Sequence, residues 1–311
     1  MQPGKTVNTP CRTSILAFDG GGVRGVFQAC LVNELHKRTG LLNHVTAFAG
    51  TSTGALMAAC LAWDIRRIDE AVDLYARIGS DVFTGLKQTP RKLFPFSPNY
   101  SADRLAAGLK SFFSCDGSSP EFASCKTRCL VFAISLGTHE VITFDSRFPS
   151  PRNLSVIDVL LSSSAAPTYF RPHTFSNRLF VDGGLGCNNP AWPSVNHFVS
   201  SGIPIEATKV LSIGTCSRPS SIGLIPPAWR ARFMWAVPTI NICMDTTSNA
   251  SNEYCRTMLG DRFLRLDGTS RVRENIPLDA QRLAHKHLID VAHSVASDRS
   301  VIESVEEWLS R

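Results

Sequence analysis

The sequence predicts an α/β fold built around a largely parallel β-sheet. Short apolar or β-branched runs alternate with segments of helical periodicity, which is the pattern of strands joined by helices. The chain has 311 residues, of which 43% are hydrophobic and 19% are charged. A chain of this length and composition can bury a large core, so general disorder is excluded.

Six strands are expected from the apolar runs, and they span residues 15–18, 45–49, 130–135, 141–144, 179–181 and 210–213. Between the first two, apolar residues from Phe27 to Leu35 recur at helical spacing, and a second such pattern runs from Ile68 to Ile78. We expect both segments to be packing helices. Because no repeat or change in composition divides the chain, we expect one domain over residues 1–311.

Two long segments, residues 84–100 and 217–245, interrupt this alternation. Both combine aromatic with basic side chains, such as Lys87 and Phe94 in the first segment and Trp229 and Arg232 in the second. This composition suits lids or binding loops at a lipid interface. The same composition also fits the alternative that these segments are loops and a helix that only cover the core.

Composition also limits the partners and the compartment. The 32 Lys and Arg exceed the 26 Asp and Glu by a formal charge of +6, which suits an anionic surface but predicts no nucleic-acid partner. The first 13 residues lack the apolar region of a signal peptide, and ten cysteines include no CxxC pair. The longest apolar run, 55–63, is shorter than the roughly 20 residues that cross a bilayer. We expect a cytoplasmic protein with reduced thiols that associates with membranes peripherally.

The motif DGGGVRG at 19–25 follows an expected strand and precedes an expected helix. It fits the GxGxxG pattern of dinucleotide binding, which also needs an acidic residue about 20 positions later. Residues 41–54 contain no Asp or Glu, which argues against a dinucleotide cofactor. Successive glycine amides at a helix N-terminus suit a bound phosphate or a transient oxyanion instead.

The motif GTSTG at 50–54 lies between the strand expected at 45–49 and the helix-forming run 55–61. A strand, a GxSxG turn and a helix are the parts of a nucleophile elbow, in which flanking glycines permit the sharp turn. Ser52 is therefore the candidate nucleophile, and Gly50 and Gly54 are the glycines of the turn. The alternative is a glycine-rich turn without chemistry.

A serine hydroxyl needs a base to become an effective nucleophile. The strand at 179–181 leads into Asp182, Gly183 and Gly184. Asp182 is therefore expected at the carboxyl edge of the sheet, where α/β folds place their active sites. There it would accept the serine proton if burial raises its pKa.

A Ser/Asp/His triad is the alternative way to activate the serine. In the chain order Ser, Asp, His, the candidate histidines are His197, His285, His287 and His293. None of them lies in a recognisable motif.

These motifs, in this order, resemble the patatin-like phospholipase family, in which a DGGGxRG loop, a GxSxG elbow and a later DGG or DGA motif occur. The runs SSSAAPTYF at 162–170 and LSIGT at 211–215 support the resemblance, which spans roughly residues 14–215. The resemblance implies a three-layer α/β/α sandwich with a mostly parallel central sheet. It also implies a lipid acyl hydrolase of the phospholipase A type.

The resemblance further implies a dyad without histidine, in which Ser52 attacks a fatty-acyl ester of a membrane phospholipid and Asp182 is the general base. The glycine-rich loop would form the oxyanion hole through the amides of Gly20, Gly21 and Gly22, with Arg24 orienting the loop and Gly25 ending the motif. Such a dyad requires no metal and no other cofactor.

Three further expectations concern the rest of the chain and the rival functions. Residues 216–311 carry no signature and would complete the fold and cover the site.

Some bacterial relatives are membrane-degrading effectors that a signalling nucleotide activates, and the basic residues Lys87, Arg91 and Lys92 suit such a ligand or lipid headgroups. The rival functions are an α/β-hydrolase esterase with a histidine triad and a non-catalytic lipid-binding or storage protein.

Overall fold

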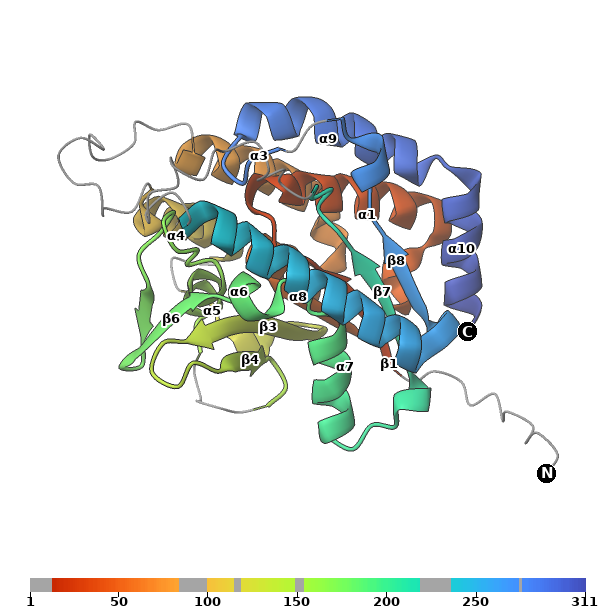
Figure 1. Ribbon diagram of the computed structural model, residues 1–311, viewed down its shortest axis with the longest axis horizontal. Helices are drawn as coiled ribbons and strands as arrows, with labels where there is room; N and C mark the ends of the chain where they lie inside the picture. The colour runs from red at the N-terminus through yellow and green to blue at the C-terminus, as the bar shows by residue number, and fades with distance from the viewer. Residues whose placement is uncertain (1–12, 84–99, 115–118, 149–153, 219–235, 274–275) are drawn as a thin grey trace, which may run out of the picture.

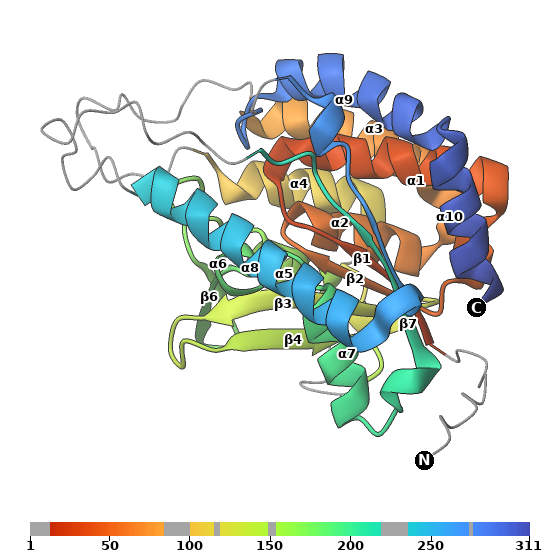
Figure 2. The same cartoon turned by 45° about the vertical axis from the view of Figure 1, so that its right-hand side comes forward.

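The computed structural model describes residues 13–83, 100–114, 119–148, 154–218, 236–273 and 276–311. In this part of the chain a mixed eight-stranded sheet lies between two layers of helices (Figures 1 and 2). The expected α/β/α sandwich is thereby confirmed. No helix in the described residues is long and apolar enough to cross a bilayer.

The sheet has the strand order β5-β6-β3-β2-β1-β7-β8, and β4 also pairs with β3. Its parallel part consists of β1 (Thr13–Phe18), β2 (Ala47–Thr51), β3 (Arg128–Ser135), β7 (Thr208–Ile213) and β8 (Phe263–Leu266). The antiparallel part consists of β4 (Val141–Asp145), β5 (His173–Phe175) and β6 (Arg178–Asp182). The parallel sheet that the sequence predicts is therefore extended by antiparallel strands on one side.

All six expected strands are present, and the difference that matters for the site is at β2. This strand begins at Ala47 and continues through Gly50 to Thr51, so it leads directly into Ser52. The sequence predicts neither β5 nor β8, because their three and four residues are too few to show a periodic pattern.

Helices cover both faces of the sheet. One layer contains α1 (Gly25–Thr39), α2 (Thr53–Trp63), α3 (Ile68–Phe83), α4 (Ala102–Phe113), α5 (Val156–Ser163), α9 (Gln281–Ala296) and α10 (Arg299–Ser310). The opposite layer contains α6 (Gly184–Cys187), α7 (Ala191–Ser200) and α8 (Ala236–Leu259), and α8 runs across that face (Figure 2). The two helices expected at 27–35 and 68–78 are α1 and α3.

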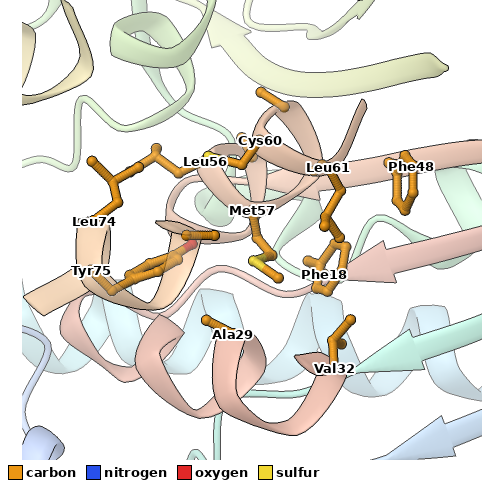
Figure 3. Packing of buried hydrophobic residues seen from close by; sticks show 14 of the residues in the cluster. Phe18, Ala29, Val32, Phe48, Leu56, Met57, Cys60, Leu61, Leu74 and Tyr75 are labelled. Atoms are coloured by element: carbon orange, nitrogen blue, oxygen red, sulfur yellow. The ribbon is translucent and has the colours of Figure 1, made fainter. Parts of the chain in front are cut away.

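The core consists of two clusters, one on each face of the sheet, because successive side chains of the central strands point to opposite faces. Leu16 and Phe18 of β1 join the cluster formed with α1, α2 and α3, whereas Ile15 and Ala17 join the cluster formed with α7 and α8. Figure 3 shows the first cluster, in which Phe18 lies beside Met57 of α2. Because both faces of β1 are buried, its sequence is a continuous apolar run rather than an alternating one.

Candidate active site

Ser52 occupies a sharp turn between β2 and α2. Its backbone has φ 55° and ψ −122°, a conformation that residues with a side chain rarely adopt. The turn is tight because a Cβ on Gly50 would lie 2.1 Å from the carbonyl oxygen of Gly54. A Cβ on Gly54 would in turn lie 2.1 Å from the carbonyl oxygen of Phe18 in β1. The local sequence thus needs both glycines, and the strand, turn and helix expected around Ser52 are all found.

Asp182 lies at the end of β6, and its carboxylate contacts the serine. Ser52 Oγ donates a hydrogen bond of 2.6 Å to Asp182 Oδ2. The strand β3 brings the two residues together, because Phe132 pairs with Thr51 and the next residue, Ala133, pairs with Asp182. The structure therefore joins the two residues that the sequence analysis selects as nucleophile and base.

Burial makes the carboxylate of Asp182 more basic than an exposed one. The residue is 6% exposed, and burial raises its pKa from the usual 3.8 to about 6. Hydrogen bonds from Ser52 Oγ and from the Gly184 amide, the latter 2.7 Å from Oδ1, act in the opposite direction. The pKa of this aspartate is thus close to the range that general-base catalysis requires near neutral pH.

Ser163 fixes the backbone of the candidate nucleophile. The amide of Ser52 donates to Ser163 Oγ at 2.9 Å, and that hydroxyl donates to the carbonyl oxygen of Phe132 at 2.6 Å. In the sequence, the run 162–170 is recognisable only as a family block. Because α5 packs beside β3, Ser163 of this run can hold the elbow in place.

The glycine-rich loop faces the serine, but not all of its amides are free to bind an oxyanion. The Gly20 amide donates to the carbonyl oxygen of Asn188 at 3.0 Å and is therefore occupied. Among the described residues the amides of Gly21 and Gly22 have no acceptor, and Gly22 has a φ of 57°, which favours glycine. Of the three amides expected to form an oxyanion hole, Gly20 therefore already has an acceptor, and those of Gly21 and Gly22 are available for such a role.

Arg24 and Asp19 hold this loop from opposite ends. Arg24 is 5% exposed, and its Nε donates to the carbonyl oxygen of Gly21 at 3.2 Å. Asp19 is 3% exposed and forms a bidentate ion pair with Arg265 of β8, with N–O distances of 2.8 and 2.7 Å. The expected orienting role of Arg24 fits this contact. Arg265 is not predicted from the sequence, because it lies 246 residues from Asp19 and in no motif.

An apolar pocket, here called the acyl pocket, opens beside the serine. Ser52 and Asp182 lie in its wall. Most other lining side chains are aliphatic or aromatic, including Leu56, Phe83, Leu105, Tyr169, Phe170, Ile240, Met244 and Leu278. An apolar pocket whose wall includes Ser52 and Asp182 suits a fatty-acyl chain whose ester lies at the serine.

None of the eight histidines, all of which lie in the described residues, lines the acyl pocket. His197 Nε2 lies 2.8 Å from Asp145 Oδ2, a carboxylate that also binds Arg128 at the start of β3. His285, His287 and His293 are exposed on α9. The histidine triad therefore has no candidate histidine at Ser52.

Two other expectations concern residues beyond this pocket. Lys87, Arg91 and Lys92 lie outside the described residues, as do most of the two irregular segments. In the described ranges no group of three or more His, Cys, Asp or Glu is arranged to hold a metal ion.

Comparison with known proteins places the chain in a family. Residues 16–195, more than half of the chain, match the family model described as Patatin-like phospholipase. The chain belongs to the patatin-like phospholipase family. The protein is thus a lipid acyl hydrolase with the patatin fold.

Several relatives of this patatin-like protein have names that state an activity. It is 27% identical over 261 residues to a cGAMP-activated phospholipase of Pseudomonas aeruginosa, covering 81% of this chain and 77% of the relative. A cGAMP-activated phospholipase of Vibrio cholerae is 26% identical over 298 residues, covering 86% and 82%. Human calcium-independent phospholipase A2-gamma is 24% identical over 345 residues, which covers 95% of this chain but 41% of the human protein.

Proposed function

We propose that the protein hydrolyses the fatty-acyl esters of membrane phospholipids with Ser52 as nucleophile and Asp182 as general base. The observation that carries the proposal is the 2.6 Å hydrogen bond from Ser52 Oγ to a buried carboxylate in the wall of an apolar pocket. The absence of histidine from this pocket favours direct proton transfer between the two residues.

Acylation begins when Ser52 Oγ attacks the ester carbonyl carbon and its proton moves to Asp182 Oδ2. The carbonyl oxygen becomes negative, and the amides of Gly21 and Gly22 donate hydrogen bonds to it. Removing one donor of this kind typically lowers the rate by about 10²–10³. When the ester C–O bond breaks, protonated Asp182 returns the proton to the leaving alkoxide, so the lysolipid departs as a neutral alcohol.

Deacylation uses the same residues with water in place of the serine. Asp182 accepts a proton from water as the water oxygen attacks the acyl carbon of acyl-Ser52. The bond from carbon to Ser52 Oγ then breaks, and Oγ recovers the proton from Asp182. The products are a fatty acid and the starting enzyme.

Substitution of each member of the dyad tests this proposal. We expect Ser52→Ala and Asp182→Asn to reduce fatty-acid release from phospholipid vesicles at least 10³-fold, as measured by mass spectrometry. Ser52→Ala should also abolish labelling by a fluorophosphonate probe, whereas the control Ser304→Ala, on α10 and outside the acyl pocket, should behave as the unmodified protein does. A folded, unmodified protein that neither labels nor releases fatty acid would favour lipid binding or storage. Loss of activity on replacing His197, His285, His287 or His293, with folding intact, would favour the triad.

We also infer that the beginning of α8 contacts the lipid surface. Ile240 and Met244 line the acyl pocket, while Val237 and Ile242 of the same helix are 40% and 45% exposed. Exposed apolar side chains beside an apolar pocket suit insertion into a lipid interface. We expect Val237→Ser combined with Ile242→Ser to weaken sedimentation with anionic vesicles. The matched control is Tyr254→Ser combined with Met258→Ser, at the other end of α8, and an equal loss in both would contradict the inference.

A cyclic dinucleotide is the second partner that we propose, as an activator. Two relatives named cGAMP-activated phospholipases align with more than four fifths of this chain, which supports the proposal. The test is the rate of fatty-acid release with cGAMP and with a panel of other cyclic di- and trinucleotides. Equal rates across the panel would remove the activator from the proposed function.

A further inference from the structure

A second cavity, here called the arginine cavity, lies next to the acyl pocket and shares Tyr169 and Leu278 with it. Its volume is about 200 Å³. One water molecule needs roughly 10–15 Å³ by the same measure, so the cavity has room for a hydrated anionic group. Unlike that of the acyl pocket, its lining includes several charged and amide side chains beside apolar ones, namely Arg24, Arg218, Asn241 and Asp245.

Arg24 is more deeply buried than Arg265 and Arg128 and, unlike them, has no carboxylate partner in the part of the chain that the structure describes. Arg265 binds Asp19 and Asp267, and Arg128 binds Asp145, each with an N–O distance below 3 Å. Arg24 is 5% exposed, yet its Nε contact with the carbonyl of Gly21 is its only hydrogen bond to the described residues. None of its nitrogens lies within 4.0 Å of a carboxylate there. A buried guanidinium is costly unless it is paired, so the two terminal nitrogens suit an anion in the cavity.

The rest of the cavity adds one more positive charge. Arg218 forms no ion pair with the described residues, and its Nη1 donates to the backbone carbonyl of Arg273 at 3.0 Å. Among the described residues of the wall Asp245 is the one carboxylate, and its Oδ1 accepts a hydrogen bond from Ser217 at 3.2 Å. Two guanidinium groups against one carboxylate leave an excess of positive charge, and planar guanidinium groups match phosphate oxygens in geometry.

The position of the cavity relative to the oxyanion loop indicates which anion it takes. Arg24 contacts Gly21, one of the two residues whose amides face the ester carbonyl in the proposed mechanism. In a glycerophospholipid the phosphodiester is joined to the acyl ester through the glycerol carbons. An ester at Ser52 therefore places the phosphate near the loop on which Arg24 lies.

We propose that the arginine cavity binds a phosphodiester, with Arg218 as a specificity-determining residue. For the lipid source of this group the proposal rests on the proposed phospholipase function, because the phosphate is then that of the substrate under hydrolysis. A free cyclic dinucleotide carries the same chemical group, and the experiment distinguishes the two sources.

The first measurement compares two short-chain substrates that stay monomeric in solution, dihexanoyl phosphatidylglycerol and dihexanoylglycerol. Monomeric substrates remove any effect of binding to a lipid surface. We expect Arg218→Gln to lower the ratio of kcat/KM for the phospholipid over the diglyceride about tenfold, through KM, which corresponds to about 1.4 kcal/mol, because a neutral amide replaces a charge-assisted hydrogen bond to the phosphate. Arg218→Lys should recover part of the ratio, and Asp245→Asn, which removes the opposing charge, should raise it. Arg256→Gln, an exposed arginine of α8 outside the cavity, is the matched control for net charge.

The second measurement uses Ser52→Ala, with and without Arg218→Gln, in calorimetric titrations with dihexanoyl phosphatidylglycerol and with cGAMP. Weaker binding of the lipid alone supports the substrate phosphate as the occupant, and weaker binding of cGAMP alone supports a free phosphodiester there. An unchanged ratio in the first measurement together with unchanged binding of both ligands overturns the proposal. If the unmodified protein cleaves neither substrate, the proposed function fails, and the titrations still test the cavity.

Discussion

At the scale of single residues, the burial of Asp182 suits the role of base that we propose for it. An exposed carboxylate binds protons too weakly to take one from a serine, whereas burial penalises the charged form and raises the pKa of Asp182 to about 6. Its two oxygens have separate roles, since Oδ1 accepts from the Gly184 amide and Oδ2 accepts from Ser52 Oγ. This arrangement orients one lone pair of the carboxylate toward the nucleophile.

The pH dependence of hydrolysis follows from this pKa. Only the ionised form of Asp182 can accept the serine proton, so kcat/KM should rise with pH, reach half its maximum at about pH 6 and then level off. The measurement is the hydrolysis of a soluble ester from pH 4.5 to 8.5. A rate that is independent of pH over this range would contradict Asp182 as the base.

Asp182→Asn should make the folded protein more stable at pH 8. The pKa of Asp182 is higher in the folded than in the unfolded chain, so its contribution to stability is fully present below about pH 4 and is lost as the pH rises through about 6. Asparagine has no charge to bury and retains both hydrogen bonds by donating to Ser52 Oγ. We expect a gain of about 1–3 kcal/mol in the free energy of unfolding, since one pKa unit corresponds to about 1.4 kcal/mol. Denaturant unfolding at pH 8 and pH 4 measures it, and the gain should shrink at the lower pH.

At the scale of the elements, β3 determines where the two halves of the dyad meet. Its residues 128–132 pair with β2, and its residues 133–135 pair with β6. β4 occupies the other edge of β3 over the same stretch, so β2 and β6 lie end to end along one edge. Ser52 directly follows β2 and Asp182 ends β6, which is why they are in contact across 130 residues of sequence.

Gly54→Ala should disrupt the packing of α2 on β1. The added Cβ would lie 2.1 Å from the Phe18 carbonyl, and backbone atoms on both sides leave little freedom to adjust. We expect a loss of about 1–3 kcal/mol or more in the free energy of unfolding, typical of overpacking, together with a large loss of activity. Thermal unfolding and fluorophosphonate labelling measure the two effects. The matched control is the exposed Gly137→Ala, where the φ is not positive and the nearest atom to the added Cβ, Ser135 Oγ, lies 3.9 Å away. An equally small effect at both positions would contradict the packing argument.

Arg265→Gln should weaken the oxyanion loop from a distance. It removes the partner of Asp19 and leaves a buried carboxylate unpaired, which typically costs about 3–5 kcal/mol. We expect lower thermal stability and slower fluorophosphonate labelling of Ser52, because Asp19 anchors the loop. Adding Asp19→Asn to Arg265→Gln should recover part of the stability, since the most deeply buried carboxylate is then neutral and only the more exposed Asp267 has lost its partner. If the losses of stability caused by Arg265→Gln and by Asp19→Asn simply add in the double variant, this coupling between the two residues is excluded.

At the scale of the whole molecule, residues 216–311 complete the layers that the catalytic motifs require. β8 extends the sheet beside β7, α9 packs on α1, and Lys209 Nζ donates to the carbonyl oxygen of Trp308 at 2.9 Å. Leu278 lines the acyl pocket, and its carbonyl accepts the Val23 amide. We propose on these grounds that the chain folds as one domain whose C-terminal part also closes the active site.

A chain ending after Thr215 tests this proposal. It retains every catalytic motif but exposes one edge of the sheet and the face of α1 that α9 covers. We expect it to lack a cooperative thermal transition and to show no fluorophosphonate labelling. Co-expression with residues 216–311 as a separate chain should restore both in part. A cooperative, labelled chain of residues 1–215 would show that the C-terminal part is a separate unit.

The sequence by itself determined the fold class, the family and the three motifs, because each of these depends on residues close together in the chain. The alternation of apolar runs predicts the layers, and the elbow at 50–54 and the turn at 182–184 follow from local backbone requirements. The contact between Ser52 and Asp182 depends on the register of β3, and the roles of Arg265 and Ser163 depend on contacts across 246 and 111 residues. Only the tertiary structure decided these, and it also showed that Asn188 occupies the Gly20 amide, because hydrogen-bond partners and burial depend on which distant segments pack together.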